Sequence, residues 1–285
     1  MRIIMLGDVV GEPGLAILEK RLPFLATEYS ADFTVVNGEN ALGGFGLSAE
    51  TLDRILAAGA DAVTGGNHIW EKREFWPVLD REKRVLRPMN YPETGNGQCP
   101  GRGWVKIDKP SGQEAITWLV VNLQGREFMN SIDCPFKAFD AIEERIKNRD
   151  FSDGGAHCDE TPGAEPESNP VILVDFHAES TREKEALAYY LDGRVSAIAG
   201  THTHVQTADE RILPNSSAYI TDLGMTGMLD GIIGMDPKVC LDRARNQVLY
   251  RMETAASGGK PAIQGVIVEI DGETKKAVSI RRVPR

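Results

Sequence analysis

The chain has 285 residues, of which 41% are apolar and 26% are charged, and its formal net charge is −10. Such a composition is typical of a globular protein with a sizeable core and excludes the intrinsically disordered class. The acidic balance provides no basic surface for long nucleic acid, because that binding depends on neutralising phosphates. Small anionic substrates are not excluded, because metal ions bound to some of the acids would reverse the local potential.

No stretch of the sequence resembles a membrane span or a secretory leader. A strand pattern begins at Arg2, and no apolar run approaches the roughly 20 residues that cross a bilayer. The cysteines lie far apart and lack the C-x-x-C spacing of zinc ribbons and redox pairs, which favours reduced thiols at Cys99, Cys134, Cys158 and Cys240. We therefore expect a cytoplasmic protein without a membrane partner.

Predicted strands and helices alternate along the N-terminal part of the chain. Short apolar runs predict strands at residues 2–6, 33–36 and 62–64. Helical patterns are expected at residues 15–29, 51–58 and 69–79. Ser48 is expected to cap the second of these helices, and Pro23 to bend or split the first.

The whole chain, residues 1–285, is predicted to form one domain of mixed sheets with flanking helices. Loop excursions rich in Gly and Pro are expected near 88–100 and 150–170. A C-terminal hairpin is expected around Asp271-Gly272, between strands 263–270 and 277–283. Further strands are predicted at 104–107, 115–123, 171–174, 195–199 and 218–221, and further helices at 136–149 and 181–191.

Polar side chains follow the ends of five predicted strands. In an open α/β sheet, the carboxyl ends of parallel strands border one crevice in which ligands bind. Two of these side chains, His202 and His204, are two positions apart and point to the same side if extended backbone continues. The residues expected to converge are Asp8, Glu39, Asn40, Asn67, His68, His177, His202 and His204.

These side chains predict a metal centre. Carboxylates, amides and imidazoles form a mixed oxygen and nitrogen set, which suits manganese, iron or zinc better than calcium. The seven candidate ligands, all except His68, exceed what one ion needs, and a bridging carboxylate would let them hold two ions ~3.5 to 4 Å apart. Such a pair activates a shared water for attack on phosphorus and neutralises the phosphoryl oxygens. His68 is the candidate proton donor for the leaving oxygen.

Each candidate also has a purely structural interpretation. Asp8 could cap a helix, and Asn67 could be an ordinary turn amide. His177 could form a polar core pair with Asp175, and His68 could orient a ligand instead of donating a proton. The segment that follows His177 has two interpretations, substrate contact or a capped helix with exposed charges. The residues concerned are Glu179, Thr181 and Lys184.

The candidates also carry a resemblance to a known superfamily. Their ordered motifs resemble those of the calcineurin-like metallophosphoesterases: Gly7-Asp8, Gly38-Glu39-Asn40, Gly66-Asn67-His68, His177 and Gly200-Thr201-His202-Thr203-His204. Four longer stretches resemble the bacterial YmdB type: Gly7-Asp8-Val9-Val10-Gly11, Asn37-Gly38-Glu39-Asn40, Asp175-Phe176-His177-Ala178-Glu179 and the segment from Thr203 to Asp209. The match runs nearly end to end. Two departures from the general superfamily pattern are Val10 in place of a histidine and Glu39 in place of an aspartate.

The resemblance implies a fold and a division of the ligands. The fold would be the αββα sandwich, in which mixed sheets are flanked by helices. Glu39 would bridge the two ions, for which we favour iron or manganese with zinc possible, and Asn40 would compensate for the histidine missing at position 10. One ion would be held by Asp8, Glu39, Asn40 and His204, and the other by Glu39, Asn67, His177 and His202.

The resemblance also implies an activity. Proteins of the YmdB type resemble cyclic nucleotide phosphodiesterases, which act on 2′,3′-cyclic and also on 3′,5′-cyclic substrates, and they commonly form homo-oligomers. Metal ligands alone do not determine the size of the substrate pocket, so a phosphomonoesterase or nucleotidase remains an alternative. A regulatory protein that binds metal and nucleotide without turnover is the other alternative, although His68 favours turnover.

Overall fold

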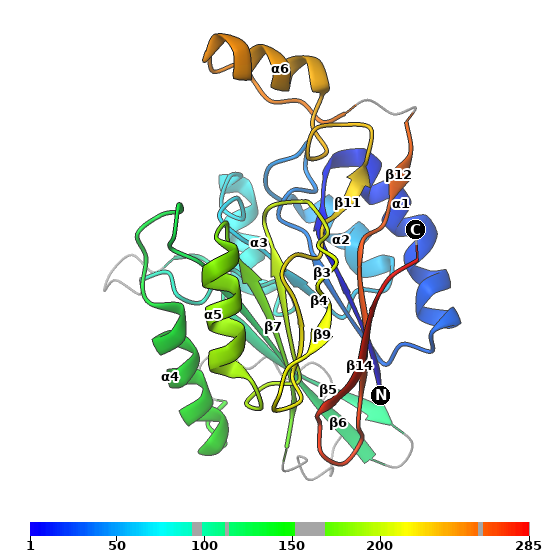
Figure 1. The fold of residues 1–285 in the computed structure, drawn as a ribbon, viewed down its shortest axis with the longest axis vertical. Coiled ribbons are helices and arrows are strands. Elements are labelled where there is room, and N and C mark those ends of the chain that lie inside the picture. The colour runs from blue at the N-terminus through cyan, green and yellow to red at the C-terminus, as the bar shows by residue number, and fades with distance from the viewer. Residues whose placement is uncertain (93–98, 112–113, 152–168, 256–258, 285) are drawn as a thin grey trace.

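The computed structural model describes residues 1–92, 99–111, 114–151, 169–255 and 259–284. Within these residues, the strands form two large sheets and one small sheet, with helices on the outside (Figure 1). The predicted mixture of sheets and flanking helices is confirmed. No described helix is both long and apolar enough to span a bilayer.

One large sheet combines N-terminal strands with the C-terminal hairpin. Its members are β1 (Arg2–Leu6), β3 (Phe33–Asn37), β4 (Ala62–Thr64), β13 (Gly265–Ile270) and β14 (Ala277–Arg282). They are ordered β14-β13-β1-β3-β4, and β1, β3 and β4 are parallel. The hairpin pairs antiparallel through β13 to β1, as the sequence predicts. The carboxyl ends of the three parallel strands therefore share one edge.

The second large sheet contains six strands from the middle of the chain. They are β5 (Trp104–Ser111), β6 (Glu114–Gln124), β7 (Val171–His177), β8 (Ala197–Thr201), β9 (Arg211–Ile212) and β10 (Ala218–Ile220), in the order β5-β6-β7-β8-β10-β9. The four central strands are parallel. A third, small sheet was not predicted from the sequence. It consists of β2 (Asp8–Val9), β11 (Met225–Met228) and β12 (Pro261–Ala262).

The two large sheets share a buried core. Phe33 of one sheet stacks on Trp118 of the other, with ring centroids 4.7 Å apart. Such an aromatic pair adds about 0.5–1.5 kcal/mol to the gain from burial. The apolar residues that surround this pair come from alternate positions of both sheets and include Ile3, Met5, Val35, Val120, Leu173 and Ala199. This shared core packs the two sheets face to face.

Helices cover the outer faces of both sheets. Side chains of α1 (Gly11–Glu28) and α2 (Ala49–Ala57) pack with the five-stranded sheet, and those of α4 (Pro135–Lys147) and α5 (Thr181–Leu191) pack with the six-stranded sheet. Figure 1 shows α4 and α5 on one side of the molecule and α1 on the other. The predicted cap of α2 is present, since Ser48 and Thr51 form a capping box.

Two helix predictions need correction. The helix expected at residues 15–29 is present, but it begins earlier, at Gly11, and Pro23 does not split it before its end at Glu28. A proline removes one helical hydrogen bond, but leucines buried on both sides of it hold the helix against the sheet: Leu15, Leu18, Leu22 and Leu25.

The helix expected at residues 69–79 is replaced by a turn, a short 3₁₀ segment (Arg73–Phe75) and α3 (Trp76–Arg81). Pro77 occupies the first turn of α3, where its missing N–H costs nothing, and prevents a helix from running through it. A further helix, α6 (Pro237–Asn246), was not predicted from the sequence, and none of its residues is buried. Of the two expected loop excursions, 93–98 and 152–168 lie outside the described residues.

Candidate metal centre

The candidate residues lie where strands of both large sheets end. Three of the strands, β1, β3 and β4, belong to the five-stranded sheet, and two, β7 and β8, belong to the six-stranded sheet. The residues that the structure brings together are Asp8, Glu39, Asn40, Asn67, His68, His177, His202 and His204. They converge between two sheets, which corrects the expectation of a crevice along one open sheet.

Four of the residues form a group around Asp8. Nδ2 of Asn40 donates to Oδ1 of Asp8 over 3.2 Å and lies 3.2 Å from Nε2 of His204. The same ring nitrogen is 3.5 Å from Oδ1 of Asp8. Asn40 also donates to Oε1 of Glu39 over 3.4 Å. All four side chains are buried, which keeps water from separating them.

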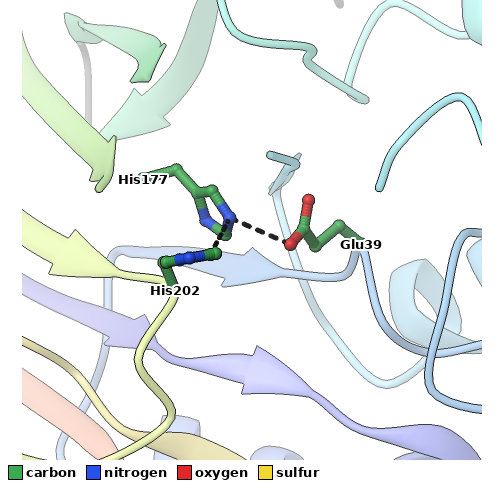
Figure 2. Close-up of side chains that lie close together, drawn as sticks. All are labelled: Glu39, His177 and His202. Carbon is green, nitrogen blue, oxygen red and sulfur yellow. Dashed lines mark hydrogen bonds and ion pairs between the residues drawn. The ribbon is translucent and has the colours of Figure 1, made fainter. Parts of the chain in front are cut away.

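A second group surrounds His177. Its Nε2 lies 3.0 Å from Oε1 of Glu39, 3.0 Å from Oδ1 of Asn67 and 3.0 Å from Nδ1 of His202. Figure 2 shows Glu39, His177 and His202 pointing toward one another. These three side chains satisfy the spacing that a metal ion requires. Oε1 of Glu39 contacts both groups and therefore joins them.

The nitrogen and oxygen atoms of the two groups are better suited to binding cations than to hydrogen bonding with one another. A ring nitrogen carries at most one hydrogen, yet Nε2 of His177 faces three polar atoms that all bear lone pairs. Oδ1 of Asn40 is buried without a hydrogen-bond partner. A half-turn of this amide would exchange its oxygen and nitrogen and direct the oxygen at Asp8 and His204. Lone pairs that converge in this way are what first-row metal ions bind.

The proton equilibria of the buried groups reflect their close packing. Burial alone would raise the pKa of Asp8, but His204 and His177 hold it well below its usual range. Burial would lower the pKa of His204, and Asp8 raises it to about 9. Burial and the charge of His177 outweigh the attraction of Asp8 and Glu39 and lower the pKa of His202 to about 4. The protonation state of each of these side chains therefore depends on the charges of its neighbours.

Each imidazole is oriented by a contact on its other ring nitrogen. Nδ1 of His204 donates to the carbonyl of Ile233 over 2.9 Å, and Nε2 of His202 lies 3.2 Å from Oε2 of Glu179. Nδ1 of His177 lies 3.0 Å from the hydroxyl of Thr201, which donates to Asp175 over 2.7 Å. These contacts leave Nε2 of His177 and His204, and Nδ1 of His202, directed at the centre.

His68 lies beside the two groups. Its backbone N–H donates to Oε2 of Glu39 over 3.0 Å, which fixes it next to the residue that joins them. Its Nδ1 lies 3.1 Å from Oε1 of Glu71, and its ring packs edge-on against Phe45. The side chain is 27% exposed. With Nδ1 held by Glu71, Nε2 is the nitrogen that can give a proton to a bound group.

Sequence reasoning missed most of the supporting residues. Asp175 was considered only as a partner of His177, but it accepts hydrogen bonds from Thr64, Thr201 and Asn37. Glu71 had a local signal, because it lies three residues after His68 in the chain. Lys184 does not face a substrate but is buried against Asp222.

A cavity of about 1010 Å³ lies elsewhere, against α4. Its described lining includes Arg87, Trp104 and Lys137, and none of the eight candidate residues. Size alone is a weaker indicator of a site than converging ligands and shifted pKa values. We therefore assign the candidate site to the metal-binding groups and not to this cavity.

Comparisons with known proteins identify the family of the chain. A sequence model of the YmdB-like protein family matches residues 4–283. A 2′,3′-cyclic-nucleotide 2′-phosphodiesterase of Bacillus subtilis is 44% identical over 284 residues, covering 99% of this chain and 96% of the relative.

Two solved structures resemble the whole chain. A hypothetical protein from Thermus thermophilus has a TM-score of 0.81 and 36% identity, and the match covers 99% of this chain and 98% of that one. A phosphatase from Mycoplasma pneumoniae has a TM-score of 0.81 and 33% identity, covering 99% and 92%. The likeness therefore extends over both large sheets and their helices.

Proposed function

Because this chain belongs to the YmdB-like protein family, as its motifs predict, we propose that it is a phosphodiesterase that uses two metal ions to hydrolyse 2′,3′-cyclic nucleotides. The observation that carries the proposal is the place of Glu39. Its Oε1 lies 3.0 Å from Nε2 of His177 and 3.4 Å from Nδ2 of Asn40, so one carboxylate contacts both ligand groups. A carboxylate in this place could bind one ion through each ligand group and so hold two ions close together.

The two groups correspond to the two ion sites. One ion would be held by Asp8, Glu39, Asn40 and His204, and the other by Glu39, Asn67, His177 and His202. The mixed oxygen and nitrogen donors favour iron or manganese, with zinc as the alternative. When bound, the two ions supply an activated water and neutralise the charge that develops on the phosphate oxygens.

The chain itself supplies the proton and the geometry. Cleavage between phosphorus and the 2′ oxygen leaves a 3′-monophosphate, and the 2′ oxygen must gain a proton as it departs. His68 is proposed to donate that proton from Nε2, while Glu71 holds the ring. The name of the Bacillus subtilis relative supports cleavage at the 2′ position.

The fold is proposed to be the calcineurin-like sandwich, formed by residues 1–285 as a single metallophosphoesterase domain. The shared core between the two large sheets supports this, because it joins strands from both ends of the chain. The cytoplasmic location stays a prediction.

A substrate comparison tests the proposed function. We expect metal-free protein reloaded with manganese, iron or zinc to hydrolyse 2′,3′-cyclic nucleotides fastest, with 3′,5′-cyclic substrates slower and monoesters slowest. Chromatography that resolves 2′- from 3′-monophosphates would identify the bond that is cleaved. Monoesters turned over faster than either diester would instead indicate the phosphomonoesterase or nucleotidase that the Mycoplasma pneumoniae phosphatase suggests.

We further propose that identical subunits associate through the segment of α6. This helix stands apart from the large sheets in Figure 1, and Leu241 and Leu249 are 55% and 86% exposed. Residues 237–251 are basic in a chain of net charge −10, so a second copy of the chain offers complementary charge. The cations of this segment are Lys238, Arg243, Arg245 and Arg251, against the single acid Asp242.

Sedimentation velocity would check this association. We expect the wild type to sediment as a multiple of the chain mass and a double variant, Leu241→Glu with Leu249→Glu, to sediment as a monomer. Phe24→Glu, which changes an equally exposed apolar residue on α1, is the control and should keep the assembly. A monomeric wild type, or an assembly that survives the double variant, would contradict the proposal.

A further inference from the structure

A buried ion pair lies beside the turn that carries His202 and His204. Nζ of Lys184 lies 2.7 Å from Oδ2 of Asp222, and each side chain is 1% exposed. Burying two charges costs several kcal/mol per ion, so such a pair is weak evidence for stability by itself. Its other hydrogen bonds indicate what the pair positions.

The same carboxylate binds the turn between the two histidines. Oδ2 of Asp222 accepts hydrogen bonds from the backbone N–H of Thr203 over 3.2 Å and from its hydroxyl over 2.7 Å. Thr203 separates two residues with left-handed backbone, His202 at φ 100° and His204 at φ 62°. Residues other than glycine adopt such angles at a cost of about 1–3 kcal/mol each. The turn therefore needs outside contacts to persist.

Asp222 also reaches the side of the centre that carries Asp8. Its Oδ1 accepts a hydrogen bond from the N–H of Gly224 over 2.8 Å. The carbonyl of Gly224 packs so closely on Gly7 that a Cβ there would lie 2.0 Å from it. The next residue, Met225, pairs with Asp8 between β11 and β2. One carboxylate thus connects the histidine turn with the strand that holds Asp8.

We propose that Asp222 is a positioning residue that sets the separation between Asp8 and the two histidines, with Lys184 as its buried counter-charge. One oxygen holds the turn of His202 and His204, and the other holds the segment packed against Asp8. The two halves of the centre, which come from different sheets, therefore cannot shift independently. The inference rests on the proposed metal centre and identifies how its geometry is maintained.

Four variants separate positioning from general stability. Asp222→Asn removes the charge at constant size, and Thr203→Val removes one hydrogen bond to Asp222 while both charges of the pair remain. Thr203→Ser keeps that hydroxyl and is the conservative control. Asp108→Asn is the control for a partly buried ion pair away from the centre, since Asp108, 19% exposed, pairs with Lys106 and accepts from Thr117 between β5 and β6.

The measurement is zinc binding by the metal-free protein in competition with a chromophoric chelator. We expect Asp222→Asn and Thr203→Val to weaken zinc binding by about 10- to 100-fold, the usual effect of removing a group that orients metal ligands. Thr203→Ser and Asp108→Asn should stay within about twofold of the wild type. Circular dichroism checks that each variant is folded, and Thr203→Val decides the matter if Asp222→Asn does not fold.

The outcomes distinguish this inference from the proposed function. Wild-type affinity in Thr203→Val and in folded Asp222→Asn would overturn the positioning role while leaving the metal centre intact. Equal loss of affinity in Asp108→Asn would also overturn it, because the effect would then be one of general stability. A wild type that binds no zinc would overturn both.

Discussion

Replacement of His68 by alanine is expected to lower kcat for a 2′,3′-cyclic nucleotide by about 10²- to 10⁴-fold, the usual contribution of a positioned general acid. His68 contacts Glu39 through its backbone N–H, and its ring is not one of the proposed ligands, so metal content should stay at the wild-type level. Steady-state kinetics together with elemental analysis of the same samples would check both expectations.

The choice of leaving group separates proton donation from other roles of His68. A diester with a nitrophenolate leaving group needs little protonation, so His68→Ala should slow its hydrolysis far less than that of the cyclic nucleotide. Glu71→Gln, which weakens the contact on Nδ1, should give a smaller loss than His68→Ala. Equal turnover of the cyclic nucleotide by wild type and His68→Ala would contradict the role of His68. If neither turned over substrate although both bound metal and nucleotide, the regulatory binding protein would be favoured.

Replacement of Glu39 by glutamine is expected to abolish the paired site. The amide has the same size but lacks the charge that two cations share, and it would place an N–H group where both ligand groups now meet a carboxylate. We expect metal content to fall from two ions per chain to one or none. Activity should fall by about 10³-fold or more, which corresponds to about 4 kcal/mol.

A control for Glu39 exists elsewhere in the chain. Glu183 is also a buried carboxylate, 6% exposed, and it accepts hydrogen bonds from the backbone N–H groups of Arg126 and Glu127. Glu183→Gln should lower the midpoint of thermal unfolding but retain both ions. Full metal content and activity in Glu39→Gln would contradict the bridging role.

The sequence predicted the elements whose local signals are strong. The strands follow from apolar runs and the cap of α2 follows from Ser48, and the structure has both, although β5, β7 and β8 end later in the chain than predicted. The helix expected at 69–79 failed because Pro77 and the turn after Asn67 outweigh the helical pattern. α6 was not predicted: many of its residues are charged or polar, none is buried, and only Cys240 packs, partly buried, against a core cluster.

The candidate site was predictable in composition but not in arrangement. Polar residues that follow apolar strand patterns can be recognised in the sequence, and all eight candidates lie close together in the structure. That they meet between two sheets depends on how the two sheets pack on their shared core, which no local pattern reveals. Supporting residues such as Asp222 and Thr201 are distant in sequence from what they hold, so only tertiary contacts identify them.

Anomalous diffraction from crystals of the protein loaded with manganese tests the central claim most directly. The account predicts two peaks ~3.5 to 4 Å apart, separated by the carboxylate of Glu39. One peak should be ligated by the side chains of Asp8, Asn40 and His204, and the other by those of Asn67, His177 and His202. A single peak, or peaks that lie away from Glu39, would contradict the account.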